Sequence, residues 1–170
     1  MGEGAVIEFG SSRGGSAIFI AYILKKLYPN KRIYALDTYA GMPFTDKNYD
    51  AHNVGDFSTV DFEELKNRVI ELDLKNLILV KGLFENTTSK VLTKSSGISL
   101  AHIDCDISSS VRYSYTAVCP YMVNGGYIVF DDATVSSCIG ATDVVENIVI
   151  RRDGRNSEQI WPHFVFRIYK

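Results

Sequence analysis

Acidic residues stand where two apolar segments of the sequence end, and their spacing suggests metal chemistry. The apolar runs at residues 98–103 and 126–130 are each followed by a pair of acids, namely Asp104, Asp106, Asp131 and Asp132. If the runs are neighbouring strands, the carboxylates converge and repel one another unless a cation, a proton or hydrogen-bond donors compensate their charge. Oxygen ligands favour magnesium, manganese or calcium over zinc. The pattern therefore predicts a divalent metal site.

These residues also have plainer interpretations. Asp131 and Asp132 could form a solvated turn in which one acid caps the next helix. Asp106 could be a further metal ligand. His102 should point to the opposite face of its strand from the acids, so we expect a packed or helix-facing side chain rather than a catalytic one.

A second motif with chemical meaning lies near the beginning of the sequence. A predicted strand at residues 5–9 leads into a glycine-rich turn, and the pattern ExGxxxGG over residues 8–15 does not match the GxGxxG fingerprint of dinucleotide-binding proteins. It is similar to the pattern of S-adenosylmethionine-dependent methyltransferases. Glycines let the backbone approach the amino-acid part of that cofactor, and an acid near the strand end can pair with its ammonium group. Asp37, after the next strand, could accept hydrogen bonds from two ribose hydroxyls.

Alternating strand and helix patterns must position these motifs. Apolar runs predict strands at residues 5–9, 33–36, 77–80, 98–103, 127–130 and 164–169, with helices at about 17–27, 60–72, 84–93, 111–122 and 141–148. The sequence Asn-Gly-Gly at residues 124–126 is the expected stop of the fourth helix. Such alternation predicts a three-layer, Rossmann-like α/β fold, whose mostly parallel sheet has six or seven strands and an antiparallel last strand. Residues 38–57 show no period, which is typical of a lid or binding loop.

Composition limits the classes of protein to consider. The 170 residues are 46% hydrophobic and 22% charged, with a net charge of −2. These values predict one soluble cytoplasmic domain over residues 1–170, with no nucleic-acid or membrane partner. The three cysteines, Cys105, Cys119 and Cys138, show no CxxC or Cys/His ligand spacing, so we expect buried free thiols rather than disulfides or a zinc site.

Several segments together resemble one known family, the macrocin O-methyltransferase type of metal-dependent sugar O-methyltransferases, over roughly residues 5–150. The segments that carry this resemblance are Glu8–Ser16, Asp37–Pro43, Gly55–Ser58, Lys81–Thr87, His102–Asp106, Gly125–Asp132 and Gly140–Thr142. The resemblance implies a methyltransferase fold and a magnesium-dependent transfer of a methyl group from S-adenosylmethionine to a hydroxyl of a sugar, a related small molecule or a glycan.

The resemblance also implies roles for individual residues. It places Mg²⁺ on Asp104, Asp131 and Asp132 and makes Asp106 the general base. The residues expected to contact the cofactor are Glu8, Gly10, Ser11, Arg13, Gly14, Gly15, Asp37, Thr38, Gly82, Leu83, Phe84 and Asp104.

The sequence departs from the family pattern on the acceptor side. Residues Ile107–Val111 replace the usual tyrosine and Ser-Thr pair, and Ala133 stands where a tyrosine is common. The sequence also begins close to its first strand, so we expect a domain without the family's N-terminal helical segment, whose site another copy of the chain in a homo-oligomer could complete. Two other functions remain open: a non-catalytic S-adenosylmethionine-binding module, and a glycosyltransferase that uses Asp104 and Asp106 as a metal-diphosphate motif.

Overall fold

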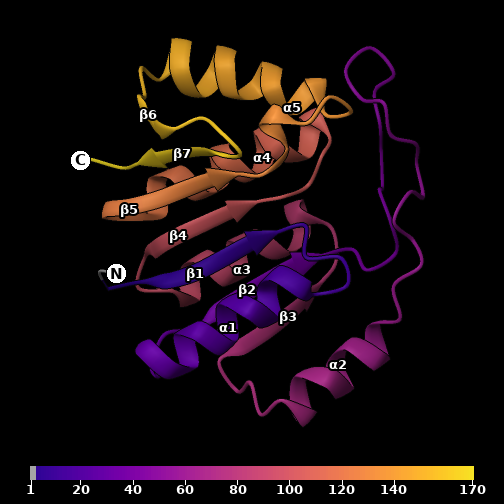
Figure 1. Ribbon diagram of the computed structural model, residues 1–170, viewed down its shortest axis with the longest axis vertical. Coiled ribbons are helices and arrows are strands. Elements are labelled where there is room, and N and C mark those ends of the chain that lie inside the picture. Colours follow the sequence, from indigo (N-terminus) through magenta and orange to yellow (C-terminus); the bar gives the residue numbers. More distant parts are fainter. Residues whose placement is uncertain (1–2) are drawn as a thin grey trace.

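A seven-stranded sheet forms the centre of the protein (Figure 1). The computed structural model describes residues 3–170. The strand order is β3-β2-β1-β4-β5-β7-β6. The strands are β1 (Ala5–Phe9), β2 (Ile33–Asp37), β3 (Leu77–Lys81), β4 (Ile98–Ile103), β5 (Met122–Phe130), β6 (Ser157–Gln159) and β7 (Phe164–Arg167).

Strands β1 to β5 are parallel, whereas β7 runs antiparallel between β5 and β6. This confirms the predicted mostly parallel sheet with an antiparallel last strand. The register sets Phe9, Ile103 and Phe130 side by side at the ends of β1, β4 and β5. The residues that follow these three strands therefore leave the sheet at one level, and they include Asp104 and Asp131.

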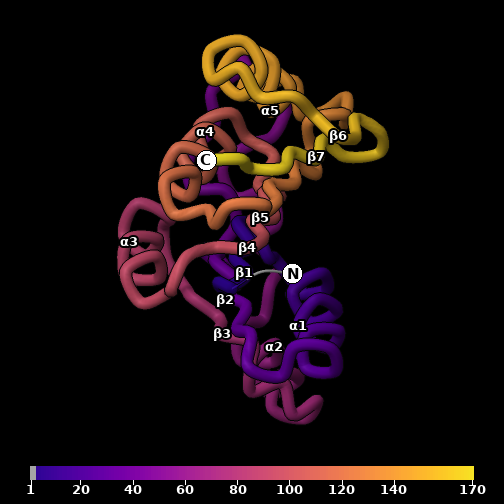
Figure 2. Tube along the Cα trace, turned by 90° about the vertical axis from the view of Figure 1, so that its left-hand side faces the viewer, coloured from indigo at the N-terminus to yellow at the C-terminus, as the bar shows by residue number. Residues whose placement is uncertain are grey.

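Helices cover both faces of the sheet (Figure 2). One core cluster packs α1 and the region of α2 against one face, and the other packs α3, α4, α5 and η3 against the opposite face. The helical elements are α1 (Gly15–Leu27), α2 (Phe62–Glu71), α3 (Phe84–Lys94), α4 (Ser108–Val118), η1 (Cys119–Tyr121), η2 (Asp132–Thr134), α5 (Ile139–Val144) and the π-helical η3 (Val145–Arg152). The three predicted layers are thus confirmed.

The prediction for the segment between α4 and β5 was wrong. The expected helix at residues 111–122 ends earlier, at Val118, because Pro120 cannot donate the hydrogen bond that would continue it. Met122 is fully buried and begins β5, five residues before the predicted start of that strand. The expected helix stop at Asn124–Gly126 is instead an irregularity within β5, where the pairing with β4 shifts register. The connection left between the predicted helix at 141–148 and the predicted strand at 164–169 also contains a short strand, β6.

A long connection between β2 and α2, residues 38–61, passes along the carboxyl ends of the parallel strands (Figure 1). Its middle is held against α4 and α5 by two hydrogen bonds, and a third, from Asp46 to Asp50, lies within the loop itself. The buried carboxylate of Asp50 accepts from the backbone N–H groups of Ser108 (2.8 Å) and Asp46 (2.8 Å), and the Gly140 N–H donates to the carbonyl of Tyr49 (3.0 Å). The predicted lid is therefore packed onto the domain.

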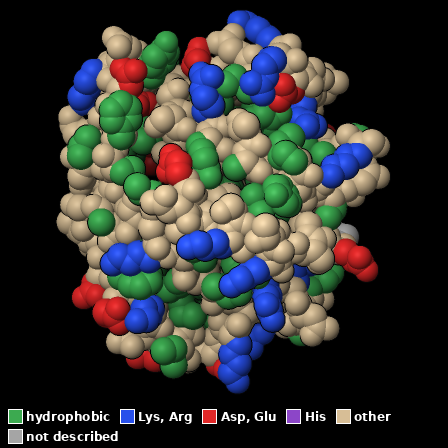
Figure 3. Space-filling view, turned by 180° about the vertical axis from the view of Figure 1, so that it is seen from behind, with side chains coloured by type: hydrophobic (Ala, Val, Ile, Leu, Met, Phe, Trp, Pro, Cys, Tyr) green, Lys and Arg blue, Asp and Glu red, His purple; other side chains and the backbone are tan. Residues whose placement is uncertain are grey.

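The outer surface carries charges of both signs. On the face opposite to that of Figure 1, lysine and arginine side chains are interspersed with acidic and apolar ones (Figure 3). Within residues 3–170, no helix has both the length and the apolar character required to cross a membrane.

The loop packs so closely against Gly140 that a side chain at this position should weaken the packing of the loop on the domain. A Cβ added there would lie 2.7 Å from the Ser108 Cβ and 2.9 Å from an Asp50 carboxylate oxygen. We expect Gly140→Ala to lower the free energy of unfolding by about 1–3 kcal/mol through overpacking. Limited proteolysis should also cut the loop faster in this variant.

The matched control is Gly15→Ala. A Cβ at Gly15 meets no atom within 4 Å, so chemical denaturation should give nearly the wild-type stability. Equal stability of the two variants would contradict the proposed packing of the loop.

Candidate functional site

A cavity of about 930 Å³ opens at the carboxyl ends of the parallel strands. Its walls come from the turn after β1, the end of β2, the loop at residues 38–61, the start of α3 and the segment between β4 and α4. The predicted site residues in its lining are Gly10, Ser11, Arg13, Gly15, Asp37, Thr38, Leu83, Phe84, Asp104 and Asp106. The structure thus brings together residues that are nearly 100 positions apart in the sequence.

Glycines shape the turn after β1 for two different reasons. Gly10 has a φ of +89°, and a Cβ there would lie 1.8 Å from the Asp104 carbonyl oxygen. This glycine therefore permits the close approach of the turn to the segment after β4. Gly15 lines the cavity and has no atom within 4 Å of an added Cβ, so its backbone is open to a ligand.

Backbone donors hold the Asp37 carboxylate at the cavity wall. Its two oxygens accept hydrogen bonds from the N–H groups of Ser12 (2.8 Å) and Tyr39 (2.6 Å). Ser12 and Tyr39 have φ values of +43° and +50°, a strained conformation for residues with side chains. A carboxylate has about four acceptor positions, so capacity remains for a ligand's hydroxyl groups.

Three residues expected at the cofactor do not line the cavity: Glu8, Gly14 and Gly82. Gly14 instead adopts a left-handed conformation at the N-terminus of α1. Glu8 is fully buried in β1, where its Oε1 lies 3.0 Å from His102 Nδ1 and its Oε2 has no hydrogen-bond partner among the described residues. Glu8 therefore lies below the cavity wall rather than in it.

Three carboxylates form a compact cluster after β4 and β5. One oxygen each of Asp104, Asp131 and Asp132 lies within 4.8 Å of the other two. Burial and the negative charges of Asp132 and Asp131 raise the pKa of Asp104 to about 8. Burial and the charge of Asp106 raise the pKa of Asp132 to about 6. The nearby His102 offsets only part of this repulsion, and the separation and all-oxygen chemistry of the three carboxylates fit a divalent cation.

His102 is packed, as expected, but it lies beside this cluster and not on the expected opposite face of its strand. In the parallel register Glu8 and His102 are directly paired, so their side chains share one face of the sheet. His102 Nε2 is 3.7 Å from the Asp131 Oδ1, and His163 Nδ1 is 3.1 Å from the same oxygen. Burial disfavours the charged imidazolium, but Asp131 and Glu8 outweigh this effect and raise the pKa of His102 to about 10.

Asp106 has different neighbours from Asp104. Its φ is +57°, and its backbone N–H donates to Asp132 Oδ2 at 2.7 Å. Burial raises the pKa of its carboxyl group. The Asp106 Oδ1 faces His52 Nε2 at 3.6 Å and Cys138 Sγ at 3.6 Å, so this acid lies between the metal cluster and the long loop.

Sequence patterns did not reveal this grouping of Asp106 with His52 and Cys138. The three residues lie up to 86 positions apart, and motif spacing detects only ligands on one local segment. Among the other missed cavity residues, Ser109 and Ser110 begin α4, and Phe57 and Thr59 come from the loop. The only sequence signal for the loop residues was the absence of a period in a long connection.

Comparisons with known proteins decide the family. The family model described as Macrocin-O-methyltransferase (TylF) matches residues 2–149. The chain belongs to this macrocin-O-methyltransferase family. The predicted family resemblance is therefore confirmed over most of the sequence.

A curated relative shows how distant the family members are. An 8-demethyl-8-(2,3-dimethoxy-alpha-L-rhamnosyl)-tetracenomycin-C 4'-O-methyltransferase from Streptomyces olivaceus is 23% identical over 145 residues. The match covers 79% of this chain, and the chain spans only about half of that relative, 55% of its length.

Solved structures confirm the methyltransferase fold. The calicheamicin methyltransferase CalS11 superimposes with a TM-score of 0.83 at 19% identity, covering 96% of this chain and 72% of its own. The O-methyltransferase NovP also gives 0.83, at 21% identity and with coverages of 98% and 72%.

The charge of Asp104 should destabilise the metal-free protein at neutral and alkaline pH. Its pKa is about 8 in the folded state and near 3.8 when unfolded, so folding favours the protonated form. Relative to its value at alkaline pH, the free energy of unfolding is raised fully below pH 4 by this pKa difference, and this stabilisation is lost as the pH rises from 4 to 8. At pH 8 without metal, we expect Asp104→Asn to melt at least about 3 °C above the wild type.

Added Mg²⁺ should reverse this order. The ion should raise the melting temperature of the wild type and leave Asp104→Asn nearly unchanged, as differential scanning fluorimetry would show. Asp73→Asn, an exposed acid far from the cavity, is the control and should respond as the wild type does. An equal Mg²⁺ response in all three proteins would refute the metal assignment.

Proposed function

We propose that this protein transfers a methyl group from S-adenosylmethionine to a hydroxyl of a sugar-containing acceptor and requires Mg²⁺ for this reaction. The observation that carries the proposal is the carboxylate cluster of Asp104, Asp131 and Asp132 beside a cavity lined by Asp37 and the glycine turn. Membership of the macrocin-O-methyltransferase family supports it.

The cofactor would lie in the cavity between the β1 turn and the start of α3. The open backbone at Gly15 leaves room for its amino-acid part, and Asp37 offers acceptor positions for the ribose hydroxyls. Leu83 and Phe84 supply an apolar wall suited to adenine. Glu8 would act indirectly, through its contact with His102.

Asp104, Asp131 and Asp132 would hold the magnesium ion. A bound divalent cation would lower the pKa of an acceptor hydroxyl, which otherwise is a poor nucleophile at neutral pH. Two histidines orient the Asp131 carboxylate, since His102 and His163 both approach its Oδ1. In many proteins, such contacts to a metal-binding side chain orient it and adjust the affinity for the metal.

Asp106 would take the proton from the acceptor hydroxyl. It lines the cavity next to Asp104, and the backbone bond to Asp132 fixes its position relative to the metal ligands. Its partly buried carboxyl group has a raised pKa, which brings its proton affinity closer to that needed for general base catalysis near neutral pH.

The acceptor would be a glycosylated small molecule or a glycan. The name of the tetracenomycin relative includes a rhamnosyl group, which motivates this choice. On the acceptor side the cavity is bordered by Met42, Phe44 and Phe57 from the loop and by Ser109 and Ser110 from α4. These side chains combine apolar surface with hydroxyl groups, a composition suited to a sugar.

Turnover of a panel of rhamnosylated and other glycosylated small molecules tests the proposal. The measurement is S-adenosylhomocysteine released from S-adenosylmethionine, with Mg²⁺ and with a chelator. We expect the chelator to abolish turnover, and Asp106→Asn to lower kcat by about 10²-fold or more, the usual contribution of a general base. Isothermal titration should show that Asp106→Asn still binds S-adenosylhomocysteine.

Two outcomes would contradict this function. Turnover unchanged by the chelator would exclude the metal role. Binding of a nucleotide sugar, without binding of S-adenosylhomocysteine, would favour a glycosyltransferase instead.

A further inference from the structure

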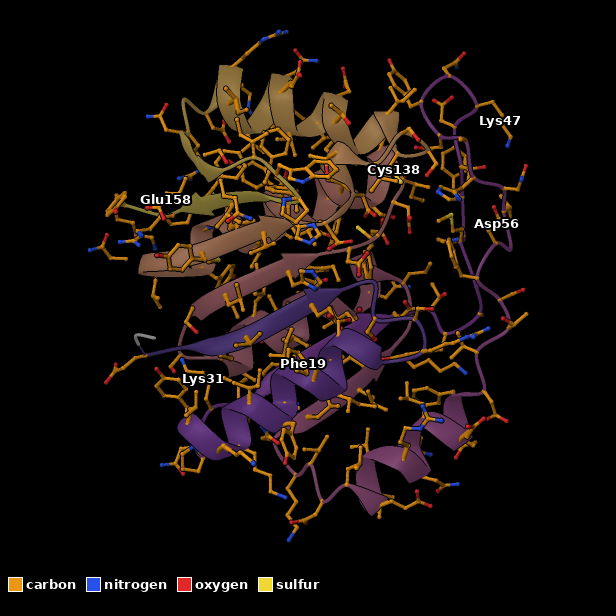
Figure 4. All side chains as sticks on the ribbon, in the orientation of Figure 1. Phe19, Lys31, Lys47, Asp56, Cys138 and Glu158 are labelled. Atoms are coloured by element: carbon orange, nitrogen blue, oxygen red, sulfur yellow. The ribbon has the colours of Figure 1, made fainter. Side chains whose placement is uncertain are left out.

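His52, Asp106 and Cys138 form a second group of ligand atoms, separate from the carboxylate cluster. His52 comes from the long loop, Asp106 from the segment after β4 and Cys138 from the residue before α5. Figure 4 shows Cys138 facing the loop that carries Lys47 and Asp56. Three distant parts of the sequence therefore meet at one point.

The spacing of the three ligand atoms is that of a tetrahedral metal site. His52 Nε2 and Cys138 Sγ are 3.7 Å apart, and each lies 3.6 Å from the Asp106 Oδ1. Ligands at about 2.0–2.3 Å from a tetrahedral zinc ion lie about 3.3–3.6 Å from one another. A metal ion can thus contact all three atoms after shifts of only a few tenths of an ångström.

The kinds of ligand select a different ion from that expected at the carboxylate cluster. Nitrogen and sulfur together favour zinc or a similar transition metal, whereas the all-oxygen cluster favours magnesium. The second nitrogen of His52, Nδ1, lies 3.7 Å from the Asp56 Oδ2. A carboxylate behind a histidine ligand is the usual arrangement at protein zinc sites, because it orients the imidazole.

Neighbouring contacts hold these ligands in place. The Asp50 and Tyr49 hydrogen bonds hold the loop on α4 and α5 within a few residues of His52. The His52 ring packs against Phe57, with 5.6 Å between ring centres. Cys138 is 1% exposed. Ligands held in place by their surroundings lose little entropy on binding a metal ion.

We propose that His52, Asp106 and Cys138 bind a transition-metal ion of the zinc class, with the fourth position open. Binding forms a bond from the metal to the Cys138 sulfur, and the thiol proton leaves to the solvent. The ion then links the long loop to the start of α5. It also contacts Asp106, so it would inhibit methyl transfer; this consequence rests on the proposed function, whereas the binding itself does not.

Cobalt(II) titration of the metal-free protein tests this site directly. Excess Mg²⁺ is present throughout to occupy the carboxylate cluster. A cobalt–thiolate bond gives an intense near-ultraviolet charge-transfer band, and four-coordinate cobalt gives strong visible bands. We expect both to appear at one equivalent per chain and to vanish when zinc is added.

Variants assign the ligands. Cys138→Ser should remove the charge-transfer band, and His52→Gln should weaken cobalt binding by about 100-fold or more. Asp56→Asn should weaken it by about 10-fold, as expected for a carboxylate behind the histidine. The control Cys119→Ser changes a thiol outside this site and should keep the full spectrum.

Two results would overturn the proposal. One is the absence of cobalt binding when Mg²⁺ is in excess, and the other is a spectrum that Cys138→Ser and His52→Gln leave unchanged. Thermal melting and S-adenosylhomocysteine binding verify that each variant is folded. If Cys138→Ser does not fold, the affinity of His52→Gln decides the question. No outcome depends on turnover, so a failed zinc site leaves the methyltransferase proposal standing.

Discussion

Repulsion among the carboxylates after β4 and β5 is the constraint on which the site depends. The parallel register of β1, β4 and β5 ends all three strands at one level, which forces Asp104 and Asp131 together with Asp132. The raised pKa of Asp104, about 8, expresses the cost of gathering these charges in a partly buried place. The packing of the sheet keeps the carboxylates close together, so binding of a cation would relieve their repulsion.

Neighbouring residues offset part of the negative charge of this cluster at different carboxylates. His102 connects the buried Glu8 to Asp131, so an acid inside β1 and an acid after β5 share one imidazole. The backbone of Asp106 binds Asp132, while its side chain turns toward the long loop. The two acids of the Asp-Cys-Asp segment thereby serve different neighbours, with Asp104 among the carboxylates and Asp106 between His52 and Cys138.

Local patterns predicted the parts of the site that lie on regular elements. Apolar runs located β4 correctly, and the acids after it followed from reading where the run ends. The same reasoning misplaced the start of β5. Helical spacing predicted a helix up to residue 122, but Pro120 ends the helix earlier, and the buried Met122 already belongs to β5. The prediction for His102 was also wrong: His102 stands two residues before Asp104, so alternation places both on one face of the sheet, and the pairing of β1 with β4 brings Glu8 beside it.

Contacts between distant segments could not be predicted in this way. The meeting of His52 with Cys138 depends on how the loop lies on α5, which in turn depends on the buried Asp50 and on the missing side chain of Gly140. No periodic pattern records such packing. The contacts that the long loop makes with the rest of the site could therefore not be predicted from the sequence.

The proposed mechanism depends on a divalent cation held by the three carboxylates beside the cofactor cavity. A crystal structure with Mn²⁺ and S-adenosylhomocysteine, analysed by anomalous scattering of manganese, tests it most directly. We expect one peak at about 2.1–2.3 Å from an oxygen of each of Asp104, Asp131 and Asp132. The absence of a peak there, with S-adenosylhomocysteine bound in the cavity, would contradict the account.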